Sequence, residues 1–242
     1  MIHIIYYIIL IYFLLGGVGF YFINRKKEHE IARKSNIKFA TYFFIINIIF
    51  FSIVLNPVAF RYLSVLIIGV GMLELFWLFH QSDYNHKRFY FFSLLIYGML
   101  STGVLLFGTL QKELILFSFI VLSIFDSFSQ ITGQLWGRKK LFPRISPNKT
   151  LGGFIGGGLI AIGSAFLLKS LFSGSELESL ILTLGIVFFA FAGDLAASFY
   201  KRKFNVKDYS KLIPGHGGFL DRFDSLIAAG AWVAFCVYVL KF

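Results

Sequence analysis

Four aspartates occur in otherwise apolar stretches of the C-terminal half of the chain, namely Asp126, Asp194, Asp221 and Asp224. A charged side chain in a membrane helix costs about 2.5–3.5 kcal/mol on insertion scales, so each acid needs a compensating partner. Carboxylate oxygens suit Mg²⁺, and phosphates of a substrate often complete its coordination shell. The four acids therefore predict a metal site for phosphate chemistry. The simpler alternative is that each acid pairs with a nearby base, as Asp221 could with Arg222.

Polar and small residues recur with helical spacing around the first of these acids. Residues three or four positions apart share one face of a helix. Those with this spacing are Ser123, Asp126, Gln130, Gly133, Gln134 and Gly137. Further along the chain, Ser198 stands four residues after Asp194 and four before Arg202. We expect these faces to line one polar cavity.

Two basic loops lie beside the acids and contain small polar residues as well as charge. The first carries Ser146, Asn148, Lys149 and Thr150, followed by Gly152 and Gly153. A helix start with free N–H groups and a lysine is a natural anion site, although the spacing is not that of a Walker A loop. The second carries Lys201, Arg202, Lys203, Lys207 and Lys211, then His216, Gly217 and Gly218. Charge alone would fit contact with lipid head groups, but the interleaved small and polar residues favour phosphate binding.

The composition excludes soluble enzymes, disordered chains and disulfide scaffolds. Of the 242 residues 57% are hydrophobic and only 14% are charged, against about 25% in soluble domains. We therefore expect an integral, multi-pass membrane protein. The net charge of +11 indicates contact with anionic lipids or phosphates. A nucleic-acid partner is not expected, because the basic residues lie in short loops between apolar stretches.

The apolar stretches predict an all-α fold of about eight transmembrane helices, because a helix needs about 20 apolar residues to cross the bilayer core. They cover residues 4–23, 39–56, 60–79, 89–110, 114–136, 151–171, 179–200 and 217–240. We expect one transmembrane domain, 1–242, with N-terminal helices in 1–110 and the polar site in 111–242. The glycines from Gly152 to Gly158 predict close helix packing rather than a cofactor site. Glu74, a lone acid in the third stretch, fits either the polar site or structural hydrogen bonding.

The basic residues also predict the orientation of the chain. Most of the 23 lysines and arginines follow the first, third, fifth and seventh apolar stretches. By the positive-inside rule these loops are cytoplasmic and both termini lie outside. The four aspartates then fall in the cytoplasmic half of the bilayer. We expect an active site that faces the cytoplasm, with the cell membrane as the location.

One set of residues in the C-terminal half has an order and spacing that would rarely arise by chance. It runs Ser198, Lys201-Arg202, Lys207-Asp208, Pro214-Gly215-His216-Gly217-Gly218, Asp221-Arg222 and Asp224. In order and spacing the set resembles the signature of CDP-diacylglycerol synthases, the phosphatidate cytidylyltransferases. The segments around Asp126 and from Ser146 to Thr150 resemble further parts of that family. One departure is visible, because Leu151-Gly152-Gly153 stands where the family usually has Trp-Glu-Gly.

The resemblance implies a reaction in which CTP and phosphatidic acid give CDP-diacylglycerol and pyrophosphate. It implies Mg²⁺ as cofactor, K⁺ as a second cation, membrane lipids as partners and a homodimer. The implied metal ligands are Asp194 and Asp221, then Asp224 and Asp126. The implied catalytic residues are Asp221, Asp194, Lys201, Arg222 and His216. The implied substrate-binding residues are Ser146, Asn148, Lys149, Thr150, Ser198, Arg202, Lys207, Gly217 and Gly218.

Two alternatives stay open beside this interpretation. A CTP-dependent kinase acting on a polyprenol or a related lipid alcohol would transfer the γ-phosphate and leave CDP. An ion-coupled transporter would use intramembrane acids to bind ions. The clustering of the acids near one face, without an evident inverted repeat, disfavours alternating access.

Overall fold

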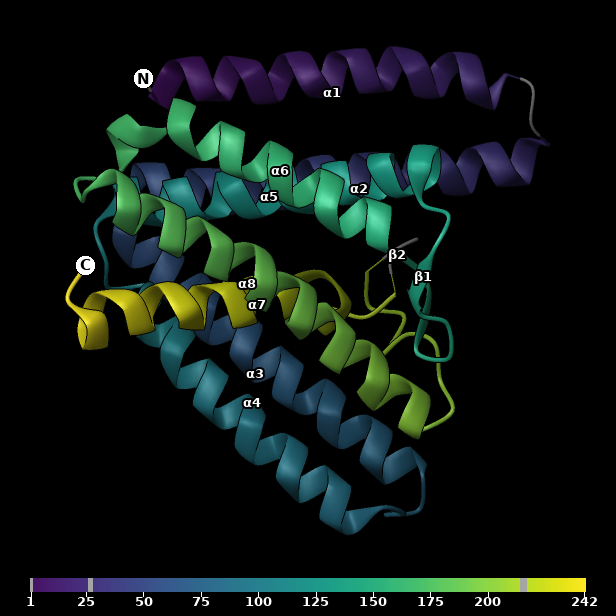
Figure 1. The fold of residues 1–242 in the computed structure, drawn as a ribbon. Coiled ribbons are helices and arrows are strands. Elements are labelled where there is room, and N and C mark those ends of the chain that lie inside the picture. Colours follow the sequence, from purple (N-terminus) through teal and green to yellow (C-terminus); the bar gives the residue numbers. More distant parts are fainter. Residues whose placement is uncertain (1, 26–27, 214–216) are drawn as a thin grey trace.

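The computed structural model describes residues 2–25, 28–213 and 217–242, and its fold is helical apart from one short hairpin (Figure 1). The helices are α1 (Ile2–Asn24), α2 (His29–Leu55), α3 (Pro57–Gln81), α4 (Lys87–Phe107), α5 (Lys112–Trp136), α6 (Leu151–Leu167), α7 (Glu176–Lys203) and α8 (Leu220–Phe235). The hairpin pairs β1 (Lys140–Phe142) with β2 (Ser146–Thr150). A short 3-10 helix, η1 (Lys169–Leu171), follows α6, and a π-helical segment, η2 (Cys236–Leu240), continues α8.

The helices of the described residues follow the expected apolar stretches, so the predicted all-α membrane fold is confirmed. Six of them are long and apolar enough to cross a membrane, namely α2, α3, α4, α5, α7, and α8 continued by η2. α6 has 17 residues and is shorter. A full crossing by α1 and by α6 stays a prediction, and so does the number of eight crossings.

Most helix boundaries differ from the expected ones by up to three residues, and larger differences occur at α2 and α6. α2 begins at His29 instead of residue 39, because charged residues such as Arg33 continue the helix beyond its apolar part, which begins at Asn36. α6 ends at Leu167 instead of residue 171, and the chain continues there as the 3-10 turn η1. Hydropathy locates the part of a helix that the bilayer can cover, not the full length of the helix.

α6 packs against α5 at a distance that only glycine allows. A Cβ atom at Gly157 would lie 2.7 Å from the backbone nitrogen of Ser129, and one at Gly156 would lie 2.7 Å from the Cβ of Thr132. The close packing predicted for this glycine run is confirmed. It brings the start of α6, and with it β2, against the end of α5.

The two ends of the molecule differ in character. The start of α1 and the C-terminus lie at one end, whereas β1, β2 and the described residues between α7 and α8 lie at the other (Figure 1). α8 contacts α3, α4, α5 and α7, and most of its side chains are buried. The predicted polar residues near the start of α8 are therefore surrounded by helices from both halves of the chain.

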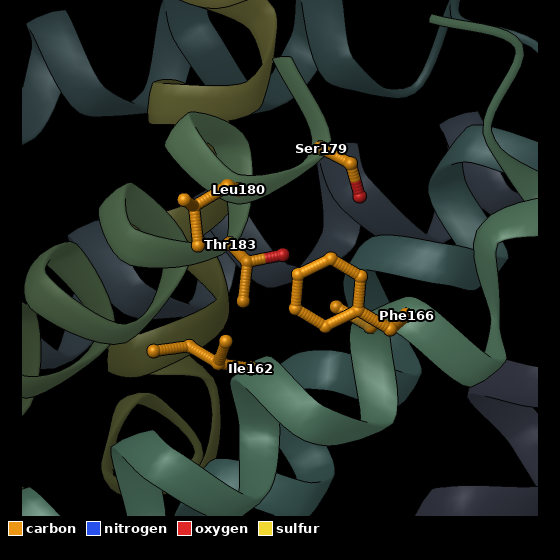
Figure 2. Close-up of a pocket in the computed structure, with 6 residues that line it drawn as sticks. Ile162, Phe166, Ser179, Leu180 and Thr183 are labelled. Atoms are coloured by element: carbon orange, nitrogen blue, oxygen red, sulfur yellow. The ribbon is translucent and has the colours of Figure 1, made fainter. Parts of the chain in front are cut away.

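A small gap lies between α6 and α7, away from the hairpin (Figure 2). Its lining is mainly apolar, with Ile162, Phe166 and Leu180, and includes the hydroxyls of Ser179 and Thr183. The buried Thr183 hydroxyl has no hydrogen-bond partner among the described residues. None of the predicted site residues lines this gap, so the chemistry must be sought at the hairpin end.

The α5–α6 contact predicts a difference between two glycine substitutions on the same helix. Gly157→Ala should destabilise the protein by about 1–3 kcal/mol, because the new methyl group would overlap the backbone of α5. Gly163→Ala is the matched control, since nothing lies within 4 Å of its added Cβ. Apparent melting temperatures of the purified protein in detergent test this. Equal values for the two variants would contradict the packing described here.

Candidate active site

The hairpin and the start of α6 position the first group of predicted site residues. Residues Lys140 and Phe142 of β1 pair with Thr150 and Ser146 of β2. The Thr150 hydroxyl accepts a hydrogen bond from the Gly153 N–H at 3.1 Å and so caps α6. Gly137 at the end of α5 lies directly against Thr150, because a Cβ there would come within 2.3 Å of its hydroxyl oxygen. The polar stripe of α5 thus adjoins the segment that carries Lys149.

Lys149 links this hairpin to α7. Its Nζ lies 2.6 Å from Oδ2 of Asp194 and 4.4 Å from the centre of the Phe191 ring. The Ser198 hydroxyl donates to Oδ1 of Asp194 at 3.4 Å. The side chain of Asp194 remains 40% exposed, so this carboxylate is accessible to a ligand while it is paired.

A second ion pair joins α7 to α8. Lys201 contacts Oδ1 of Asp221, and the two side chains are only 10% and 2% exposed. The other oxygen of Asp221 accepts hydrogen bonds from the N–H groups of Tyr209 at 3.0 Å and Gly218 at 2.8 Å. Asp221 therefore fixes both ends of the segment between the two helices. Protein donors thus engage both of its oxygens, and its predicted part as a metal ligand stays a prediction.

The remaining two aspartates complete a group of interacting charges. Asp126 and Asp224 each interact electrostatically with Asp194. Arg222 interacts with both Asp126 and Asp224. Asp224 is 9% exposed, and its Oδ1 accepts from the Ser225 N–H at 2.7 Å. The structure thus brings together acids from α5, α7 and α8 that are far apart in the sequence.

The arrangement can be tested against the needs of a metal ion. Within 2–25, 28–213 and 217–242, no three acidic, histidine or cysteine side chains converge as a metal-binding group. Mg²⁺ is commonly bound by one or two carboxylates together with substrate phosphates, so a full protein cage is not required. Mutually repelling carboxylates such as Asp194 and Asp224 fit such a site, because a cation would remove their repulsion.

Other predicted residues lie around the edge of this group. Arg202 is exposed and donates to the carbonyl oxygens of Ile145 at 3.2 Å and Val206 at 2.9 Å. It thereby ties the hairpin to the end of α7. Asn148 and Lys207 are exposed, and their substrate contacts stay predictions. His216 lies outside the described residues.

Local backbone structure explains why two positions of the predicted signature, Gly217 and Gly218, are glycine. Gly217 has a φ of +85°, a conformation that side-chain-bearing residues rarely adopt. A Cβ at Gly218 would lie 2.7 Å from the Cβ of Tyr209 and 2.8 Å from Oε1 of Glu74. The chain can pass between these groups only because the residue is glycine.

Two residues of this region were not predicted as part of the site. Glu74 of α3 is 3% exposed and accepts hydrogen bonds from Ser210, Phe219 and Leu220, so the predicted structural hydrogen bonding is present. Tyr209 is buried, and its hydroxyl donates to the Ala197 carbonyl at 3.2 Å. Burial, together with the charges of Asp224 and Asp221, raises the pKa of Tyr209 well above its usual value. An acid within an apolar stretch was the only sequence signal for Glu74.

Comparison with known proteins identifies the family. A model of the cytidylyltransferase family matches residues 1–240. The chain belongs to this cytidylyltransferase family. The phosphatidate cytidylyltransferase of Rickettsia felis is 31% identical over 231 residues, which cover 90% of this chain and 99% of the relative. That of Staphylococcus saprophyticus is 45% identical over 116 residues, 47% of this chain and 44% of the relative.

The family assignment confirms the resemblance found in the sequence. A third relative, the phosphatidate cytidylyltransferase of Haemophilus influenzae, is 42% identical over 123 residues, which cover 48% of this chain and 42% of the relative. The cytidylyltransferase match extends over the N-terminal helices as well, where the sequence shows only apolar character. The charged group described above therefore belongs to a nucleotidyltransferase fold that includes both halves of the chain.

The Lys201–Asp221 pair of this cytidylyltransferase predicts a compensation between two substitutions. Asp221→Asn alone should destabilise the protein by about 3–5 kcal/mol, because it leaves the buried Lys201 charge without its partner. Adding Lys201→Met should restore most of this stability but not activity. Lys203→Met, at an exposed neighbouring lysine, is the control. Melting temperatures of the single and double variants test this compensation. A double variant that is no more stable than Asp221→Asn would show that the two residues are not coupled.

Proposed function

We propose that the protein transfers CMP from CTP to phosphatidic acid, forming CDP-diacylglycerol and releasing pyrophosphate. The observation that carries this proposal is the convergence of the signature cations and acids at one end of the helix bundle, in a chain of the cytidylyltransferase family. Lys149, Lys201 and Arg222 come from three separate segments and meet the same group of aspartates. Cations that surround acids in this way suit a reaction between two polyanions.

The chemistry needs charge stabilisation more than proton abstraction. A phosphate oxygen of phosphatidate attacks the α-phosphorus of CTP, and the bond from this phosphorus to the oxygen bridging to the β-phosphate breaks. The attacking phosphate is already anionic at neutral pH, so no strong base is required. Preorganised cations that offset charge in the transition state are the main catalytic resource of such transfers. Lys149 and Arg222 are suited to this task by position.

A divalent metal belongs to this proposal. Asp194 and Asp224 are the carboxylates that would hold Mg²⁺ together with substrate phosphates. Asp126 also interacts electrostatically with Asp194. When bound, the ion would neutralise phosphate charge and align the two substrates. The second cation, K⁺, and the donation of a hydrogen bond by His216 stay predictions. So does the homodimer.

The proposed site faces the cytoplasm, where CTP is available, and lies at the membrane interface that exposes phosphatidate. Support comes from the basic hairpin and from the basic segment after α7, which lie at the same end of the molecule (Figure 1). The excess of lysine and arginine in these segments would keep that end on the cytoplasmic side. The cell membrane is the proposed location.

A transfer assay on the purified protein tests the function. Protein in detergent receives labelled CTP, phosphatidic acid and Mg²⁺, and the products are separated. We expect equal amounts of a CMP-bearing lipid and pyrophosphate, with loss of turnover on chelation and recovery when Mg²⁺ is restored. CDP together with a phosphorylated lipid alcohol, tested in parallel, would contradict the proposal in favour of a kinase.

Two lysine variants of the hairpin serve as a matched control in this assay. Lys149→Ala should raise the CTP concentration needed for half-maximal rate, because it removes the cation beside Asp194. Lys140→Ala removes an exposed lysine of β1 and should leave the kinetics unchanged. Equal effects of the two substitutions would remove Lys149 from the proposed site.

The orientation is tested by cysteine labelling in sealed membranes. Lys207→Cys should react with an impermeant maleimide only when the cytoplasmic face is accessible. Ser173→Cys, an exposed position between η1 and α7, should react only from the opposite face. The native Cys236 is buried, so the background should be low. Labelling of position 207 from outside would show that the orientation is the reverse of the proposed one.

A further inference from the structure

The start of α8 lacks a cap of its own. Its N-cap residue is Phe219, whose side chain has no acceptor and makes no capping hydrogen bond. The first N–H groups of a helix have no partner within the helix and must be satisfied from outside, because burying them unpaired is costly. Leu220 is 3% exposed, so its N–H group lies in the interior of the protein.

A carboxylate from the N-terminal half supplies the missing cap. Oε1 of Glu74 accepts from the Phe219 N–H at 2.8 Å, and Oε2 accepts from the Leu220 N–H at 2.6 Å. The Ser210 hydroxyl donates to Oε1 at 2.5 Å. Neither ion pair among the described residues involves Glu74. The negative charge is thus placed against N–H and O–H donors at a helix N-terminus, where the helix dipole also favours it.

The position of Glu74 is itself fixed by packing. The Tyr200 hydroxyl of α7 donates to the carbonyl of Leu75 at 2.8 Å, in a buried contact. One turn earlier on α3, Gly71 lies so close to Leu220 that an added Cβ would come within 3.2 Å of its side chain. α3 therefore meets both α7 and the first turn of α8 at this level.

Glu74 and Asp221 fix the segment between α7 and α8 from two sides. The Glu74 carboxylate accepts hydrogen bonds from Ser210, Phe219 and Leu220. The Asp221 carboxylate accepts them from Tyr209, Gly218 and Lys201. Gly217, with its φ of +85°, lies between these anchor points. A shift of this segment would move Asp221 and Arg222 together.

We propose that Glu74 is a positioning residue for the transfer reaction: through its hydrogen bonds to Ser210, Phe219 and Leu220, it sets the place of the segment that carries Gly218, Asp221 and Arg222. A role for this acid in the reaction means that α3 contributes to the site without contacting substrate. The catalytic part of this inference rests on the proposed function, whereas the structural part does not.

The experiment compares Glu74→Gln and Glu74→Leu with the wild-type chain in lipid nanodiscs. Hydrogen exchange is measured for peptides covering residues 209–213 and 217–222. Losing a hydrogen bond to a charged acceptor should speed exchange there by about tenfold or more, while peptides of α6 stay unchanged. The isosteric Gln keeps an acceptor oxygen, so its effect should lie between those of wild type and Leu.

Transfer kinetics per folded molecule separate positioning from mere stability. We expect kcat to fall by about tenfold in Glu74→Gln, with the KM for CTP within about twofold of wild type, because Lys149 and the hairpin are untouched. Ser64→Ala is the matched control, since the hydrogen bond that this buried serine of α3 makes among the described residues stays within its own helix, to the Phe60 carbonyl at 2.9 Å. It should change neither exchange of the segment nor kcat.

The outcomes are distinguishable. Wild-type exchange of the segment in both Glu74 variants would overturn the inference, and so would faster exchange with an unchanged kcat. A wild-type chain that transfers no CMP would instead contradict the proposed function. In that case the exchange measurement would still decide whether Glu74 fixes the segment.

Discussion

The buried ion pair between Lys201 and Asp221 is the contact on which the polar end of this protein depends. The two side chains are almost fully removed from solvent, where an unpaired charge is very unfavourable. Each partner therefore requires the other, and this requirement sets the spacing between the end of α7 and the start of α8. Because Asp221 also accepts from Tyr209 and Gly218, the same carboxylate orders the connecting segment. Lys149 can then meet Asp194 across a site that is already shaped.

The acids of this region divide into two kinds by their surroundings. Glu74 and Asp221 are each satisfied by three protein donors, so their charges are already compensated. Asp126 and Asp224 instead interact unfavourably with Asp194 and favourably with nearby cations such as Arg222. Neighbouring acids beside several basic side chains can attract a cation and a phosphate together. In the proposed function, a metal role therefore suits the second kind better than the first.

The sequence was sufficient for the helices and for the residue types of the site, and it failed where distant segments meet. Continuous apolar stretches identify α3, α4, α5 and α7 because the bilayer imposes one length on all of them. The pairing of Lys149 with Asp194, in contrast, depends on how closely α6 approaches α5. The role of Glu74 depends on a contact with Leu220, and no local pattern encodes a partner so far along the chain. The start of α2 was predicted too late because hydropathy does not show that its charged first turns are helical.

Gly152 lies at the same helix contact, in the stretch where the chain departs from the signature that it resembles. A Cβ atom there would lie 3.0 Å from the Trp136 carbonyl oxygen, and one at Gly153 would lie 2.6 Å from the Ser129 carbonyl oxygen. A side chain at either position would push the end of α5 away from the start of α6. That movement would carry Thr150 and Lys149 with it, because the Thr150 hydroxyl caps α6 at Gly153. A side chain at position 152 would therefore require a small shift of the end of α5 before the α5–α6 contact could form.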